Sequence, residues 1–120
     1  MEIKDFDDLI KMGQVRRVVK LGAHEIAMHT LSSDEYSGLS AAIGDDPSKV
    51  KFEELQRSVL AVAIDTIDGK VPSKDEKIRL LGLSQLGLAN MLYSEYTDMI
   101  IEQDKMLDDA KKNSSQVKLS

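Results

Sequence analysis

The residues with the clearest potential for chemistry are the carboxylates of the segment IDTIDG, which begins at Ile64. Acidic and polar side chains that precede a glycine in this way are typical of calcium-binding loops. When Gly69 is aligned with the turn glycine of such a loop, however, Ile64 takes the first ligand position and Asp75 replaces the bidentate glutamate. The spacing therefore does not predict a calcium site.

Two histidines and a pair of glycines also invite a chemical interpretation. His24 and His29 are separated by an odd number of residues, so in a strand they face opposite sides and cannot hold a metal ion together. Each is expected to be a partly exposed strand residue. Gly82 and Gly87 have the spacing of a phosphate-binding loop, but Leu-Ala follows where Lys and Ser or Thr are required. These glycines are therefore expected in packed helices.

The composition points away from catalysis, cofactors and nucleic acid. The chain has no cysteine, and its carboxylates lie mostly at expected helix starts or opposite lysines, where capping and solvation explain them. A net charge of -5 opposes the phosphate contacts that dominate nucleic-acid affinity. The longest apolar run, residues 59–64, is far shorter than the ~18 residues of a membrane span, and the acidic N-terminal segment does not have the pattern of a signal peptide. We therefore expect a cytoplasmic, non-enzymatic protein with no cofactor, metal site or membrane segment.

The apolar pattern predicts a mainly α (α+β) fold, with an N-terminal β-hairpin, a small helical bundle and a long C-terminal helix. Capping boxes at Ser32 and Ser73 mark two helix starts. We expect one domain over residues 1–112 and a disordered tail over residues 113–120. The predicted helices cover residues 5–12, 33–43, 47–68, 74–83 and 85–112. Of these, the helix over residues 47–68 is expected to be the central core helix, buried nearly all round.

The hairpin is predicted over residues 15–31, because the apolar period there changes to two. Gly22 at the first position of a two-residue loop fits a type II′ turn, and this register pairs Val19 with Ile26. An isolated hairpin is marginal in water, so its apolar face is expected to pack on the helices that follow or to join strands of another subunit.

The first strand also carries the basic cluster of Arg16, Arg17 and Lys20. Charges at this spacing are usually a solvated strand face, which is the interpretation we favour. An acidic segment of a partner is the alternative.

The last helix carries the main candidate binding surface. From Leu92 onward its apolar residues recur four and three apart, which is the spacing of a heptad seam. Leu92 and Tyr96 are favoured as core residues. Residues 99–107 have fewer elements left to cover them, so a core role and association with a partner or a second copy are equally favoured there. The candidate partner-binding residues are Tyr96, Met99, Ile100, Met106 and Leu107.

Four segments together carry a family resemblance. They are His-Thr-Leu at the end of the hairpin before a capped helix, VLAVAIDTIDG at residues 59–69, KIRLL at residues 77–81 and LYSEY at residues 92–96. In these segments the chain resembles the tail assembly chaperones of tailed bacteriophages and the related baseplate hub assembly proteins, over roughly residues 15–99. The resemblance implies a non-enzymatic factor in the cytoplasm of the bacterial host. Such a factor binds the long helical tape-measure protein and hands it to the polymerising tail subunits.

Two alternatives stay open beside this function. The first is a structural subunit of the phage tail or baseplate that is retained in the virion. The second is a small protein–protein adaptor unrelated to phages. In the first case the hairpin would complete a neighbour's sheet and the last helix would form a homo-oligomer. The resemblance also implies, for some family members, a longer form made by ribosomal frameshifting, for which the codons of residues 111–113 are the candidate site.

Overall fold

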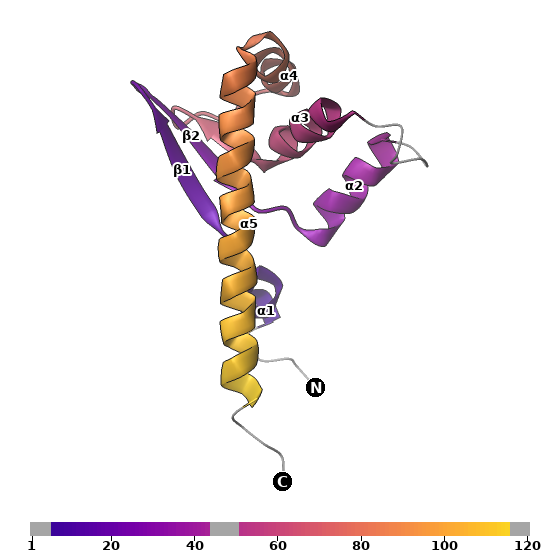
Figure 1. Cartoon of the computed structure of the whole chain (residues 1–120), viewed down its shortest axis with the longest axis vertical. Helices are drawn as coiled ribbons and strands as arrows, with labels where there is room; N and C mark the ends of the chain where they lie inside the picture. Colours follow the sequence, from indigo (N-terminus) through magenta and orange to yellow (C-terminus); the bar gives the residue numbers. More distant parts are fainter. Residues whose placement is uncertain (1–5, 44–50, 116–120) are drawn as a thin grey trace.

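The computed structural model describes residues 6–43 and 51–115, in which helices predominate (Figure 1). In chain order the elements are α1 (Phe6–Lys11), β1 (Arg16–Leu21), β2 (His24–His29), α2 (Ser33–Ile43), α3 (Phe52–Ala63), β3 (Ile64–Ile67), α4 (Lys74–Leu83) and α5 (Leu86–Ser115). The predicted fold class, a mainly helical α+β chain with an N-terminal hairpin and a long last helix, is confirmed.

Helix α5 is the spine of the molecule. Its 30 residues run along the longest axis, with the hairpin on one side and α2 and α3 on the other (Figure 1). Strand β1 and helix α3 both contact α5, and α3 in turn contacts α2 and α4. Helix α1 lies beside the C-terminal half of α5 (Figure 1). Apart from α1, the other helices and the sheet pack along the N-terminal part of α5, so its C-terminal part extends beyond them (Figure 1).

The hairpin has the predicted register and turn. Val19 lies opposite Ile26 in the antiparallel pairing of β1 with β2. Gly22 has a φ of 62°, whereas Ala23 does not have a positive φ. A type II′ turn requires a positive φ at its first central residue and a negative φ at its second. Glycine adopts the positive φ without strain because it has no Cβ atom.

The predicted helix over residues 47–68 is wrong in its second part. Helix α3 ends at Ala63 and the chain continues directly as β3, which pairs antiparallel with β2 and completes a sheet of order β1-β2-β3. Three of the four residues of β3 are β-branched, and the edge of β2 offers them ladder hydrogen bonds that a further helical turn cannot give. The start of this predicted helix, residues 47–50, lies outside the described residues.

Helix α3 is also not buried all round, as its amphipathic sequence explains. Its buried side is made by Gln56, Val59, Leu60 and Ala63. On the other side Glu54 and Arg57 are exposed. The charged residues of α3 follow this exposed side, so α3 is a wall of the core with one face open.

Both predicted capping boxes are present. The Ser32 N–H donates to Oε1 of Glu35 at 2.9 Å, and the Glu35 N–H donates to Oγ of Ser32 at 3.2 Å. Ser73 and Glu76 make the same reciprocal pair at 2.9 and 3.1 Å. Because each box satisfies two N–H groups that have no partner within the helix, α2 and α4 begin at the predicted residues.

The end of α5 differs from the expectation. A disordered tail was predicted over residues 113–120, but the helix continues to Ser115, so the prediction is wrong for residues 113–115. Residues 116–120 lie outside the described part of the chain.

The core lies where the inner face of the sheet meets α3 and α5. Its largest fully buried side chains come from β2, α3, β3 and α5, and each contributes roughly 1.5–3 kcal/mol by burial. They are Met28, Leu60, Ile64, Leu92 and Met99.

Candidate partner-binding surfaces

A groove with a mainly apolar and hydroxyl-bearing lining lies between α2, α3 and α5. Its volume is about 550 Å³, and none of the described residues that line it is charged. The α2 side contributes mainly hydroxyl groups, whereas α3 and α5 contribute mainly aliphatic and aromatic groups. The lining residues are Leu31, Ser32, Ser33, Tyr36, Ser37, Leu55, Val59, Tyr93, Tyr96, Ile100 and Gln103.

An aromatic ladder runs along the α3 and α5 side of this groove. The ring of Tyr93 meets that of Phe52 edge-on, with centroids 5.6 Å apart, and stacks on that of Tyr96 at 6.2 Å. Burial raises the pKa of the Tyr96 phenol, against a smaller opposing effect of a hydrogen bond with the backbone of Leu31. On the opposite wall Tyr36 is 62% exposed. The groove thus has a rigid aromatic side and one large apolar side chain free to contact a ligand.

A histidine between two carboxylates holds the start of the α2 wall. Nε2 of His29 lies 2.9 Å from Oε2 of Glu35, and Nδ1 lies 2.7 Å from Oδ1 of Asp65, a close approach that is not a hydrogen bond in its geometry. Burial acts to raise the pKa of Glu35, but hydrogen bonds from the Ser32 N–H and His29 outweigh it and lower this pKa. These two contacts connect β2 with α2 and β3, and they are largely shielded from solvent because the side chain of His29 is only 12% exposed.

A second apolar surface lies on the part of the molecule we call the stem, namely α1 and the C-terminal half of α5. Gly13, which follows α1 with a φ of 84°, approaches Leu107 so closely that a Cβ atom there would lie 2.9 Å from its Cδ2. Nevertheless Leu107 is 41% exposed and Met106 is 44% exposed. The large apolar residues of α1 and the segment after it are exposed to a similar extent, namely Phe6, Leu9, Ile10 and Met12.

The predicted partner-binding residues are therefore divided between these surfaces and the core. Tyr96 and Ile100 line the groove, and Met106 and Leu107 lie on the stem. The placement of Met99 on an exposed seam is wrong, because its side chain is 0% exposed within the core beneath the sheet. The expectation that Leu92 and Tyr96 belong to the core is confirmed, with 0% and 8% exposure.

The basic cluster on β1 is only partly the solvated face that we expected. Arg17 lies on the same side of β1 as Val19, and its guanidinium bridges two carboxylates of α5, Glu95 at 3.1 Å and Glu102 at 3.0 Å. Desolvation opposes the charge of Arg17, but these two carboxylates outweigh it and raise the pKa of the guanidinium. Arg17 therefore pairs with acidic residues of its own chain and not with an acidic segment of a partner. Arg16 and Lys20 are exposed, as expected.

The other chemical candidates have structural roles. Nδ1 of His24 lies 2.7 Å from Oδ2 of Asp68, and the Glu25 N–H donates to Oδ1 of the same carboxylate at 2.8 Å. These contacts, led by that of His24, lower the pKa of Asp68 and hold a residue whose φ is 52°. Among the described residues no group of three His, Asp or Glu side chains could hold a metal ion. Gly82 lies in α4 and Gly87 in α5, as expected, but both are exposed and a Cβ atom at either would meet nothing within 4 Å, so close helix packing does not explain them.

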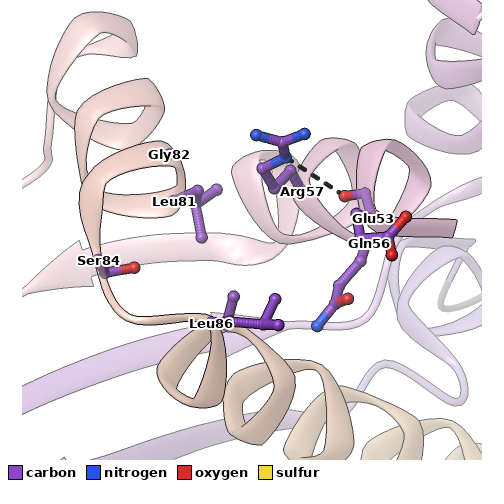
Figure 2. A pocket seen from close by; sticks show the side chains of 8 residues that line it. Glu53, Gln56, Arg57, Leu81, Gly82, Ser84 and Leu86 are labelled. Carbon is purple, nitrogen blue, oxygen red and sulfur yellow. Dashed lines mark hydrogen bonds between the residues drawn. The ribbon is translucent and has the colours of Figure 1, made fainter. Parts of the chain in front are cut away.

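A smaller hollow of about 240 Å³ lies between α3, α4 and the start of α5 (Figure 2). Arg57 lies at its edge and donates through Nε to the carbonyl oxygen of Glu53 at 3.3 Å, while the Gln56 amide donates to Oδ1 of Asn90 at 3.0 Å. The Oγ atom of Ser84 is buried without a hydrogen-bond partner. No histidine lines the hollow, so this hydroxyl has no imidazole base to activate it as a nucleophile.

Comparison with known proteins does not extend these observations, since no family model, curated protein or solved structure matches the chain. In the described ranges, no helix has the length and apolar character that crossing a membrane requires.

Proposed function

We propose that this chain is a non-enzymatic assembly chaperone of bacteriophage tails, which binds the tape-measure protein or another tail protein in the cytoplasm of the host during tail morphogenesis. The groove between α2, α3 and α5 is the observation that carries this proposal. It is open and about 550 Å³ in volume, and its described lining residues are uncharged, as a site for the apolar side of a partner helix requires. The resemblance of the sequence to tail assembly chaperones supplies the class of partner.

The aromatic and hydroxyl groups of the lining fit this role physically. Tyrosine side chains give large contact areas at low conformational cost, and they dominate binding energy at many interfaces. Tyr36 is exposed before binding, whereas Tyr93 and Tyr96 are already held against neighbouring rings. A partner helix would therefore order one aromatic side chain and find the others in place.

The test is a pull-down of the tagged full chain from its native producing cells, with mass spectrometry of the retained proteins. Recovery of a long, helix-rich tail protein supports the proposal, and loss of that protein with Tyr36→Ala places the contact at the groove. Ile78→Ala is the matched control, because Ile78 is exposed to a similar degree, 58% against 62%, but lies on α4 outside the groove. Recovery of cellular proteins only would overturn the proposal and favour an adaptor unrelated to phages.

The exposed stem favours a second candidate, a structural subunit of the tail or baseplate. Met106, Leu107 and the apolar residues of α1 offer a surface through which copies of the chain could associate. The edge of β1 is a poorer site for a neighbour's strand, because Arg16 and Lys20 are charges of the kind that protect strand edges from pairing. Abundance in finished particles discriminates the two functions, since a chaperone is absent from the virion and a structural subunit is stoichiometric.

A further inference from the structure

We propose that the groove between α2, α3 and α5 selects an amphipathic helix whose apolar stripe is bordered by lysine or arginine. The inference deepens the proposed function, on which it rests for the idea that a partner helix occupies the groove. It concerns the chemistry of that helix, which the family resemblance does not specify. The argument combines the uncharged lining with the charges carried by the walls.

The lining fixes the character of the buried side of the helix. Each lining residue in the described part of the chain is aliphatic, aromatic, a serine or an amide. The amide of Gln103 is occupied, because its Nε2 donates to Oγ1 of Thr30 at 3.3 Å. A charged side chain placed here would lose its hydration without gaining an ion pair, which is unfavourable. The helix must therefore present an apolar stripe to the groove.

The walls fix the character of its borders. Helix α2 has two acidic residues and no basic residue, and in α5 no basic residue occurs before Lys105. Over the same lengths the two walls carry the carboxylates of Asp34, Glu35, Glu95, Asp98, Glu102 and Asp104. The single basic residue of α3, Arg57, does not offset this charge at the groove, because it lines the hollow on the α4 side.

Not all of these carboxylates are available to a ligand. Glu95 and Glu102 are engaged by Arg17, and Glu35 is engaged by His29. Asp98 lies on another side of α5, since no residue three or four positions from it lines the groove. The exposed carboxylates of Asp34 and Asp104 instead adjoin lining residues along the chain, one on each of the two facing walls. A helix seated between them meets negative charge on both sides, and basic borders complement it.

Designed peptides test this inference without the natural partner. Three peptides of about 18 residues, long enough to form helices, share one leucine stripe and carry Lys, Gln or Glu at the border positions. Their binding to the full chain is measured by fluorescence anisotropy at low and high salt. We expect the Lys peptide to bind roughly tenfold more tightly than the Gln peptide, with the difference lost at high salt, and the Glu peptide to bind most weakly.

Two variants locate the effect. The double substitution Asp34→Asn and Asp104→Asn is expected to abolish the advantage of the Lys peptide and to leave the affinity of the Gln peptide unchanged. The charge-matched control, Asp75→Asn with Asp98→Asn, removes two carboxylates away from the groove lining and is expected to retain that advantage. Circular dichroism confirms that each variant is folded before binding is measured.

The outcomes separate this inference from the proposed function. Equal binding of the Lys and Glu peptides, or equal effects of the two double variants, would overturn it. So would loss of peptide binding on self-association of the chain, because a second copy would then be the occupant of the groove. Peptide selectivity without recovery of a tail protein from cells leaves the inference standing and refutes the proposed function. Recovery of a tail protein without peptide selectivity supports the proposed function and overturns the inference.

Discussion

The sharpest test of the structure compares two methionines one heptad apart on α5. Met99 is 0% exposed in the core, whereas Met106 is 44% exposed on the stem. Replacing either by alanine removes the same atoms from the same helix, so the change in helix propensity is the same. For a fully buried methionine the lost transfer energy and the cavity left behind cost about 2–5 kcal/mol, whereas a half-exposed one costs under about 1 kcal/mol.

Urea unfolding followed by circular dichroism measures this difference. With a slope of about 1.5 kcal/mol per molar urea for a chain of this size, Met99→Ala is expected to lower the midpoint by about 2 M and Met106→Ala by less than about 0.7 M. An unchanged slope for both variants shows that only the stability of the folded state has changed. Equal midpoints for the two variants would refute the burial of Met99 beneath the sheet.

Three further predictions concern single contacts. Arg17→Met keeps most of the aliphatic side chain but removes two partly exposed ion pairs. It is expected to lower the free energy of unfolding, measured by urea titration, by about 1 kcal/mol at low salt and by less at about 1 M salt. A loss of stability that does not depend on salt would contradict this. Glu35→Gln keeps the capping box but not the charge. Because the folded-state pKa of Glu35 is lowered, its ionised form stabilises the fold fully above its ordinary pKa of 4.5, and this contribution disappears as the pH falls through the lower folded-state pKa. Thermal unfolding across this range should therefore show the wild-type advantage over Glu35→Gln shrinking below pH 4.5, and an advantage that grows on acidification would show the sign to be wrong. Gly13→Ala is expected to destabilise by about 1–2 kcal/mol because the φ of Gly13 is 84°, whereas Gly38→Ala, where a Cβ atom meets nothing within 4 Å, is expected to stabilise α2 by up to about 1 kcal/mol. Opposite shifts in melting temperature check this last pair, and shifts of the same sign would count against it.

The parts of the fold that could be predicted from the sequence are those specified locally. Capping boxes, a glycine-led two-residue turn and an alternating apolar pattern each act over a few residues, and the elements they predict begin and pair as expected. Strand β3 could not be recognised in this way, because its apolar residues continue the helical pattern of α3. Its β-branched residues were the available signal, but the partner strand that decides the outcome lies far away in the sequence.

The candidate site was predicted in part for the same reason. The heptad spacing marked one face of α5, from which Tyr96 and Ile100 line the groove. Which end of that face is covered depends on where the hairpin and α1 pack, so the burial of Met99 could not be read from its spacing. Most of the other groove residues come from α2, α3 and the segment before α2, and for Tyr36 only its size and aromatic character marked it as a candidate.

The bridge from Arg17 to α5 has a consequence for biosynthesis. Its two carboxylates follow it by 78 and 85 residues in the chain. At the usual rate of about 5–20 residues per second, the ribosome needs roughly 4–16 s after Arg17 to reach the first of them, whereas a hairpin forms within about 10 µs. During those seconds any hairpin that forms lacks the helix that covers its apolar side, and without this cover it is only marginally stable in water. The rate of translation, and not the rate of hairpin formation, therefore sets when a new copy of the protein buries its core.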